Sequence, residues 1–215
     1  QTVTITITDN ESAPTVTLAA ASSSIDENSD STITLTATAS TATFQDVTVS
    51  LDGTGGTGTE GTDFGTVSDI TISAGSTTGT VTFDPTDDSI YEGNETAGIS
   101  VSGVSGGGAS ESGTQAVTIT ITENESAPTV TLTTSATSIA ENAGSSLTLT
   151  ATLSVATTAD VTVALSTSGT ATEGTDYTDG SGVVNDITIS AGSTTGTVNF
   201  TPTDDSVYEG DETAT

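Results

Sequence analysis

A short loop near residue 90 gathers carboxylates at a spacing that suits a metal ion. The segment PTDDSIYEGNET, at 85–96, places Asp87, Asp88, Glu92 and Glu95 within nine residues. Two adjacent aspartates repel each other unless a cation offsets their charge. Calcium takes about six to eight oxygen ligands from carboxylates and carbonyl groups, and this loop offers several of them. The spacing therefore predicts a calcium-binding loop.

The same loop recurs later in the chain as PTDDSVYEGDET, at 202–213. Acids from loops distant in the sequence also recur at matched positions. One acidic loop alone would be interpreted as a solvated surface, but recurrence in both copies favours a metal site. The candidates are Glu27, Asp63, Asp87, Asp88, Glu92, Glu95, Glu123 and Glu125 in the first copy, and Glu141, Asp176, Asp204, Asp205, Glu209 and Glu212 in the second.

The absence of other ligand types narrows the choice of metal. The chain has no His and no Cys, which disfavours zinc and the softer metals. Many carboxylates are available and no phosphate is implied, so calcium is favoured over magnesium. We therefore expect Ca²⁺ as the bound cofactor.

Composition excludes several classes of function. The 215 residues include 29 Asp plus Glu and no Lys, Arg or His, so the formal net charge is −29. No side chain can neutralise a nucleic-acid backbone, and direct attachment to anionic membranes is disfavoured. No His or Lys is available as a general base and no Cys as a nucleophile, so the formal possibility that remains is a two-carboxylate hydrolase. With only 4 Phe and 3 Tyr to line a cleft, we expect no enzyme.

The chain is one repeat seen nearly twice. QTVTITITDNESAPTVTL at 1–18 returns as QAVTITITENESAPTVTL at 115–132. The two copies begin at residues 1 and 115, and a repeat of that length suits an independent domain better than a solenoid unit. We expect 1–11 to be the last strand and exit linker of a preceding repeat, 12–125 a complete repeat, and 126–215 a second repeat truncated before its last strands. The chain is thus interpreted as an internal window of a longer protein.

Alternating residues predict the elements that position these acids. Apolar and polar residues alternate at 3–8, 15–18, 32–38, 46–51, 68–73, 79–83, 98–104 and 117–122. No stretch has helical periodicity, and 102–113 is a glycine-rich hairpin loop. The pattern predicts an all-β fold of tandem immunoglobulin-like antiparallel β-sandwich domains.

The motifs GTGTEGTDF at 56–64 and ISAGSTTGTVTFDPTDDSIYEGNE at 72–95, with their partners at 169–177 and 189–212, resemble the Calx-beta domain. That family occurs in sodium–calcium exchangers and in repetitive bacterial surface proteins. The resemblance implies a calcium cluster at one end of each sandwich. It assigns the acids named above as ligands, adds the backbone carbonyls of Ile90 and Val207, and gives Asp9 and Glu11 to a preceding repeat. One departure is that Glu123-Asn124-Glu125 replaces the exchangers' run of consecutive Asp.

We expect these repeats to be calcium-stiffened structural spacers of a long extracellular, cell-surface adhesin or filament of bacterial type. Their partners would be calcium ions and neighbouring repeats, with no nucleic acid and no membrane insertion. Two alternatives stay open. One is a polymerising filament subunit completed by strand donation, and the other is a glycan- or protein-binding module. The Thr ladders, such as Thr2, Thr4, Thr6 and Thr8, resemble the flat arrays of ice-binding proteins, but we interpret them as ordinary solvent-facing strand residues.

Overall fold

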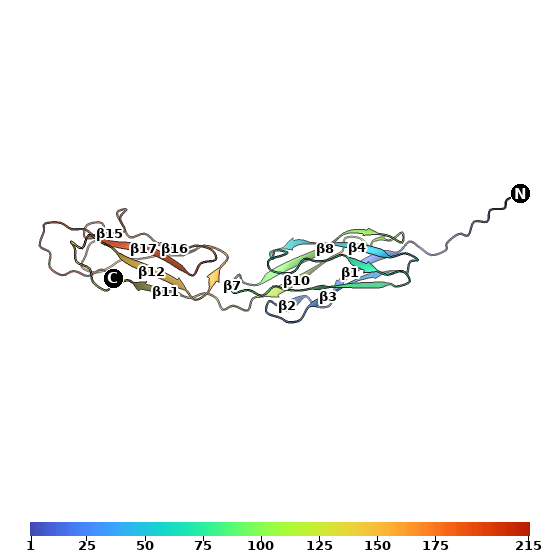
Figure 1. The fold of residues 1–215 in the computed structure, drawn as a ribbon, viewed down its shortest axis with the longest axis horizontal. Coiled ribbons are helices and arrows are strands. Elements are labelled where there is room, and N and C mark those ends of the chain that lie inside the picture. The colour runs from blue at the N-terminus through green and yellow to red at the C-terminus, as the bar shows by residue number, and fades with distance from the viewer. The chain divides into compact units, whose positions relative to one another are not determined.

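The computed structural model describes residues 1–215 and is built from strands, turns and loops (Figure 1). The chain divides into two compact units. The first unit comprises Gln1–Asp88 and Gly93–Asn124, and the second comprises Ser89–Glu92 and Glu125–Thr215. The structure contains no helix that is long and apolar enough to span a membrane.

Two sheets make up the first unit. The four-stranded sheet has the order β6-β3-β1-β9, and the five-stranded sheet has the order β2-β10-β8-β4-β5. Their strands are β1 (Thr15–Ala20), β2 (Ser24–Asp26), β3 (Ile33–Ala39), β4 (Val47–Gly56), β5 (Ile70–Ile72), β6 (Thr78–Phe83), β8 (Glu95–Ser105), β9 (Ser110–Glu111) and β10 (Ala116–Thr122). The predicted all-β sandwich fold is confirmed.

The core of the first unit follows from the alternation of its strands. Ile33, Leu35 and Ala37 on β3 are buried, while the threonines between them face outward. From the other sheet, Ile99 on β8 and Ile119 on β10 are fully buried in the same core cluster. Each aliphatic side chain buried in this way contributes about 1.5–3 kcal/mol relative to its exposed state. The two inner faces therefore hold the sheets together.

The sequence predicted antiparallel sheets, but two of the strand pairs in the first unit are parallel. β2 pairs with β10 in parallel, and β1 pairs with β9 in parallel, each over two or three residues. Ile25 on β2 lies opposite Ile121 on β10, so both strands run toward the same edge of the sheet. Glu27 follows β2 and Glu123 follows β10, and this pairing therefore brings the loops of the two glutamates together.

The second unit repeats part of this plan. It has a four-stranded sheet in the order β11-β12-β17-β15 and the pairs β14-β16 and β13-β7. A small core of Ala151, Leu153, Ile187 and Ile189 is buried, and Tyr177 stacks on Phe200 with ring centroids 4.5 Å apart. The strands are β7 (Ile90–Tyr91), β11 (Val130–Thr134), β12 (Leu147–Leu153), β13 (Ala156–Thr157), β14 (Val161–Val163), β15 (Tyr177–Thr178), β16 (Ile187–Ile189) and β17 (Thr195–Pro202).

Residues 3–8, predicted to be the last strand of a preceding repeat, pair with no strand in this structure, so that assignment stays a prediction. Residues 1–14 form no strand, and Val3, Ile5 and Ile7 are 82–93% exposed. A strand needs a neighbour for its backbone hydrogen bonds, and no strand of the structure pairs with this segment. The nearly identical sequence at 117–122 does form β10, because β8 and β2 flank it.

Candidate metal centre

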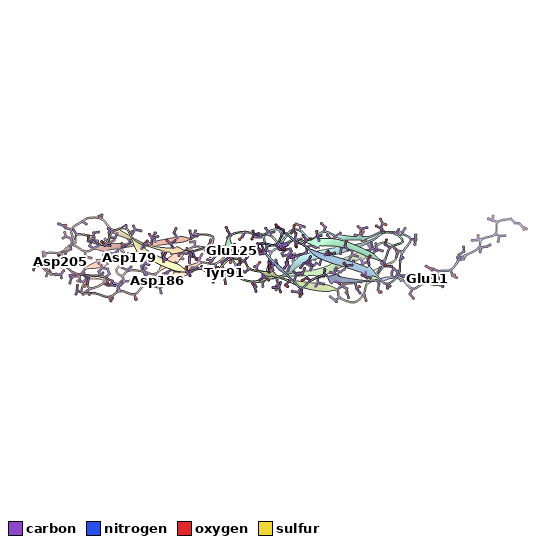
Figure 2. The ribbon with its side chains drawn as sticks, turned by 90° about the horizontal axis from the view of Figure 1, so that it is seen from below. Glu11, Tyr91, Glu125, Asp179, Asp186 and Asp205 are labelled. Carbon is purple, nitrogen blue, oxygen red and sulfur yellow. The ribbon has the colours of Figure 1, made fainter.

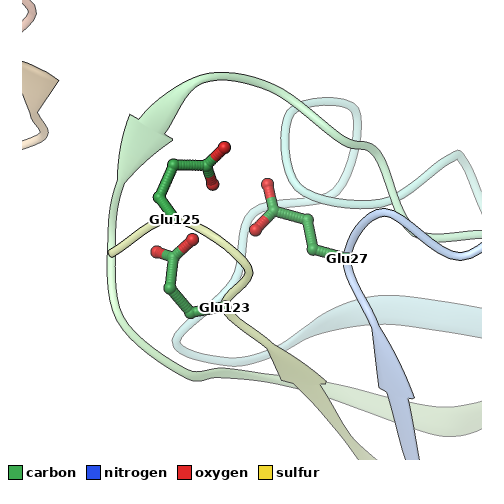
Figure 3. Close-up of side chains that lie close together, drawn as sticks. All are labelled: Glu27, Glu123 and Glu125. Atoms are coloured by element: carbon green, nitrogen blue, oxygen red, sulfur yellow. The ribbon is translucent and has the colours of Figure 1, made fainter. Parts of the chain in front are cut away.

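The ends of β2 and β10 carry the first group of carboxylates. Figure 3 shows Glu27, Glu123 and Glu125 approaching one another from adjacent loops, and one oxygen of each lies within 4.8 Å of the others. Glu27 is buried, with 6% of its surface exposed. Its backbone N–H donates to the Thr122 carbonyl at 3.0 Å, which fixes the glutamate beside the end of β10.

The acidic loop is tied to the same two glutamates through its backbone. The Asp88 N–H donates to Glu27 Oε1 at 3.3 Å, and the Gly93 N–H donates to Glu123 Oε2 at 2.7 Å. Asn124 Nδ2 donates to Asp87 Oδ1 at 3.2 Å. These contacts place Asp87 and Asp88 at the same end of the first repeat as Glu27.

A tight turn before β5 supplies Asp63 to a second group. The Thr59 N–H donates to Asp63 Oδ2 at 2.6 Å, and the Asp63 carbonyl accepts from the Thr86 N–H at 3.0 Å. Asp63 is 9% exposed and groups with Glu92 and Glu95, again with one oxygen of each within 4.8 Å of the others. The turn therefore holds one Asp63 oxygen, and the Thr86 contact holds the segment that follows β6 beside the turn.

The second unit contains two groups that share one residue. Glu141, Asp205 and Glu209 form one, and Asp176, Glu209 and Glu212 form the other, each with oxygens within 4.8 Å of one another. The supporting contacts match those of the first repeat. The Asp205 N–H donates to Glu141 Oε1 at 3.0 Å, and the Thr172 N–H donates to Asp176 Oδ2 at 2.6 Å. The second unit therefore contains two adjoining carboxylate groups that share Glu209.

The carboxylates around Glu209 repel one another, as the shift in the Glu209 pKa indicates. Partial loss of hydration raises the pKa of Glu209 above its usual range, and the charges of Asp176, Asp205, Glu212 and Glu141 raise it further. Loss of hydration, the charge of Asp176 and a hydrogen bond with Asp176 also raise the pKa of Glu212. No Lys, Arg or His exists in the chain to offset these charges. A bound cation would relieve the repulsion directly.

Several of the predicted ligands lie outside the four groups. Asp87, Asp88 and Asp204 belong to the acidic loops but do not reach a group in this structure. Ile90 lies in β7, and Val207 occupies the equivalent loop position with its N–H donating to Asp205 Oδ1 at 2.6 Å. Asp9 and Glu11 are exposed, and the Glu11 N–H donates to Asp9 Oδ1 at 3.3 Å. Glu11 is labelled in Figure 2. The Glu11 hydrogen bonds hold the pKa of Asp9 below its usual value.

Other acids have a structural role that the sequence did not reveal. Glu60 Oε1 accepts from the Val67 N–H, and Glu173 Oε1 accepts from the Val184 N–H, both at 2.6 Å. Asp186, labelled in Figure 2, accepts from the Leu165 N–H at 2.9 Å. Only their recurrence at matched positions, in loops rather than in the acidic run, could have signalled this. Acids of this class brace loops and need no metal.

The donor set defines what the four groups can bind. All of their side-chain donors are carboxylate oxygens, and backbone carbonyls lie in the same loops. Hard divalent cations with oxygen coordination fit such a set, whereas zinc and copper prefer nitrogen and sulfur. The residues present therefore fit calcium, with Glu27, Asp63 and Glu209 as examples of the carboxylates that would hold it.

Comparison with known families identifies the fold type. The model of the Calx-beta domain matches residues 9–125 and 123–215. The chain belongs to the Calx-beta family. This confirms the resemblance found in the sequence, and the tandem Calx-beta units fit a calcium-binding repeat module. No curated protein matches the chain.

Solved Calx-beta structures resemble the chain at low identity. The apo form of the Calx CBD1 domain is 18% identical with a TM-score of 0.43, and the match covers 52% of this chain and 99% of that one. CBD12 from CALX1.2 is 20% identical with a TM-score of 0.42, and the match covers 86% and 73%. The calcium-binding domain CBD12 of CALX1.1 is 16% identical with a TM-score of 0.42, covering 84% and 72%.

Proposed function

We propose that the chain is a calcium-stiffened spacer within a secreted, cell-surface adhesin or filament of bacterial type. The observation that carries this proposal is the pair of carboxylate groups in the second unit that share Glu209. Similar groups form around Glu27 and Asp63, so each repeat would carry its own calcium centre. A spacer needs rigidity but no reaction, which agrees with a chain that has no His, Lys or Cys.

The stiffening follows from where the ligands lie in the sequence. Glu123 and Glu125 lie where the two family matches, 9–125 and 123–215, meet. Binding calcium through these glutamates would fix the linker to the end of β10. Fixing the linker removes conformational freedom from a segment that otherwise carries several like charges. Successive repeats would then be held at a restricted angle.

The first test removes the shared ligand. Glu209→Gln should weaken calcium binding to the second unit by about tenfold or more, because calcium affinity depends on the number of charged ligands. The same substitution should raise the melting temperature in chelator, because it removes one of the repelling charges around Glu212 and Asp176. Isothermal titration calorimetry and thermal melting measure the two effects.

The matched control is Glu173→Gln, which removes one charge from the same unit. Glu173 accepts hydrogen bonds from the Val184 N–H and the Thr167 hydroxyl and belongs to no carboxylate group. Its substitution should leave calcium affinity within about twofold while changing stability equally with and without calcium. If both variants lost affinity equally, net charge rather than the site would govern binding, and the proposed centre would be wrong.

A further inference from the structure

One glutamate in each repeat stands three residues before an aspartate of a carboxylate group. Glu60 precedes Asp63, and Glu173 precedes Asp176, within the shared segment TEGTD. Neither glutamate belongs to a carboxylate group itself. Both are half-buried, and a half-buried carboxylate needs hydrogen bonds to offset its loss of hydration.

The segment TEGTD forms the same closed turn in both repeats. In the first repeat, the Asp63 N–H donates to the Thr59 carbonyl at 2.9 Å, and the Thr59 N–H donates back to Asp63 Oδ2 at 2.6 Å. In the second repeat, Asp176 and Thr172 make the same two bonds at the same distances. The turn therefore fixes one oxygen of the aspartate, and the shape of the turn decides where the other oxygen points.

The glutamate ties this turn to the chain that returns from the next loop. Glu60 Oε1 accepts from the Val67 N–H, and Glu173 Oε1 accepts from the Val184 N–H, both at 2.6 Å. The two partners are seven residues apart in the first repeat and eleven in the second. The same bond thus forms across loops of different length, so it is a constant feature of the repeat.

Packing leaves the Glu60 side chain little freedom to move away from this bond. Val67 is 8% exposed, and Phe64, directly after the turn, is fully buried. A Cβ at Gly53 would lie 3.3 Å from Glu60 Cδ, and equally close to one atom each of Phe64 and Val67. The carboxylate of Glu60 therefore packs against the edge of the core, between the turn and the returning chain.

We propose that this glutamate, Glu60 in the first repeat and Glu173 in the second, is a positioning residue for the calcium ligand three residues later. It holds the turn by its hydrogen bond to a buried valine and does not contact the ion, so its role rests on the calcium function proposed above. Residues that orient the ligands of a metal typically change the metal affinity by about 10–100-fold when they are substituted.

Two substitutions separate the hydrogen bond from the charge. Gln keeps an oxygen acceptor at the same reach but removes the charge, whereas Asp keeps the charge but is one methylene too short to reach the valine N–H. Each is made in both repeats of the full chain, so that every calcium centre carries the same change. The Gln variant combines Glu60→Gln with Glu173→Gln, and the Asp variant combines Glu60→Asp with Glu173→Asp.

Calorimetric titration with calcium should give the Gln variant an affinity within about twofold of the parent, and the Asp variant an affinity about tenfold weaker. A glutamate that acted through its charge would give the opposite order. A glutamate that only stabilised the fold would lower the melting temperature of the Asp variant equally in calcium and in chelator, whereas a positioning residue should lower it more in calcium. The opposite order of affinities, or equal melting losses, would overturn the positioning role.

A second measurement tests the hydrogen bond without calcium. In chelator, hydrogen exchange at the Val67 and Val184 amides should be slow in the parent and in the Gln variant, and severalfold faster in the Asp variant. Unchanged exchange in the Asp variant would also overturn the positioning role. Normal calcium binding by both the parent and the Asp variant would overturn this role alone, whereas a parent that bound no calcium would overturn the proposed function together with it.

Discussion

Glu209 and Glu173 carry the same charge in the same unit, but their surroundings differ in kind. Glu173 accepts hydrogen bonds from the Val184 N–H and the Thr167 hydroxyl, which hold its side chain in place. Glu209 faces other carboxylates, which destabilise its ionised form and raise its pKa. Stability without metal should therefore depend on pH through Glu209 and Glu212.

The sign of this dependence follows from the raised pKa of Glu209. A carboxyl group whose pKa is raised in the folded state stabilises the fold below its unfolded pKa of about 4.3, and that contribution is lost as pH rises through the folded pKa. In chelator, the melting temperature of the second unit should therefore fall as pH rises above about 4.5. Asp52 and Asp179 have lowered pKa values and stay ionised throughout this window.

Calcium should reverse the trend, because it binds the ionised carboxylates and its affinity grows as they lose protons. The rise in melting temperature caused by calcium should thus be larger at pH 7 than at pH 4.5. Scanning calorimetry of the parent and of a Glu209→Gln, Glu212→Gln double variant checks this. The variant should show a flatter pH profile in chelator, and an unchanged profile would contradict the assignment of the repulsion to these two groups.

The sequence predicted the acidic loops, but it did not predict which of their acids join a carboxylate group. Recurrence marked both Asp63 and Asp176, which the structure brings into carboxylate groups. Asp87 and Asp88 were marked as strongly, yet in this structure they belong to no carboxylate group: Asp87 Oδ1 accepts from Asn124 Nδ2, and the Asp88 backbone N–H donates to Glu27 Oε1. Residue type and spacing place a carboxylate in a loop, whereas the direction of its side chain depends on backbone turns that only the folded chain fixes.

At the scale of the elements, β5 and β6 approach so closely that a side chain between them would clash. A Cβ at Gly79 would lie 2.3 Å from the Thr71 carbonyl oxygen, and a Cβ at Gly196 would lie 2.5 Å from that of Thr188. Both contacts involve backbone, which cannot move aside without disturbing the core residue Ile70 or Ile187. The glycine at this position is therefore required by the packing of the strands.

Gly79→Ala should accordingly destabilise the first unit by about 1–3 kcal/mol, the usual cost of overpacking a core. Denaturant unfolding measures the change in the free energy of unfolding. Thr80→Ala, the neighbouring residue on the exposed face of β6, should cost about 0.5 kcal/mol or less. Equal effects of the two substitutions would show that the close approach of β5 and β6 does not restrict the position.

The elements were the most predictable level, because alternation reports directly which face of a strand is buried. Buried and exposed residues alternate along β3 and β5 as expected. The short parallel pairings of β2 and β9 could not be predicted, since each involves only two or three residues and no periodic pattern. The segment 3–8 differs from these, because its alternation is clear but no strand of this structure pairs with it.

At the scale of the whole molecule, the net charge of −29 opposes the compact folded state of each repeat in the absence of cations. Monovalent salt screens the repulsion mainly between charges that lie more than a Debye length apart, whereas a cation held by several carboxylates cancels the repulsion between those carboxylates. Calcium that binds only the folded chain adds about 2.7 kcal/mol of stability at a concentration of one hundred times its Kd. That increment is a large share of the stability of a marginal domain.

Calcium should therefore raise the melting temperature of the full chain. It should also narrow the range of distances between the two repeats that the linker 123–128 permits. Small-angle scattering should give a larger and better-defined maximum dimension in calcium than in chelator. Digestion by a protease that cleaves after acidic residues should slow in calcium, because the loops around Glu92 and Glu209 would be ordered. Magnesium at the same concentration serves as the control. It prefers near-octahedral sites with several retained waters, so it should reproduce only a small part of the effect. Identical scattering and melting in calcium and in chelator would contradict stiffening by calcium, even if calorimetry showed that the ion binds.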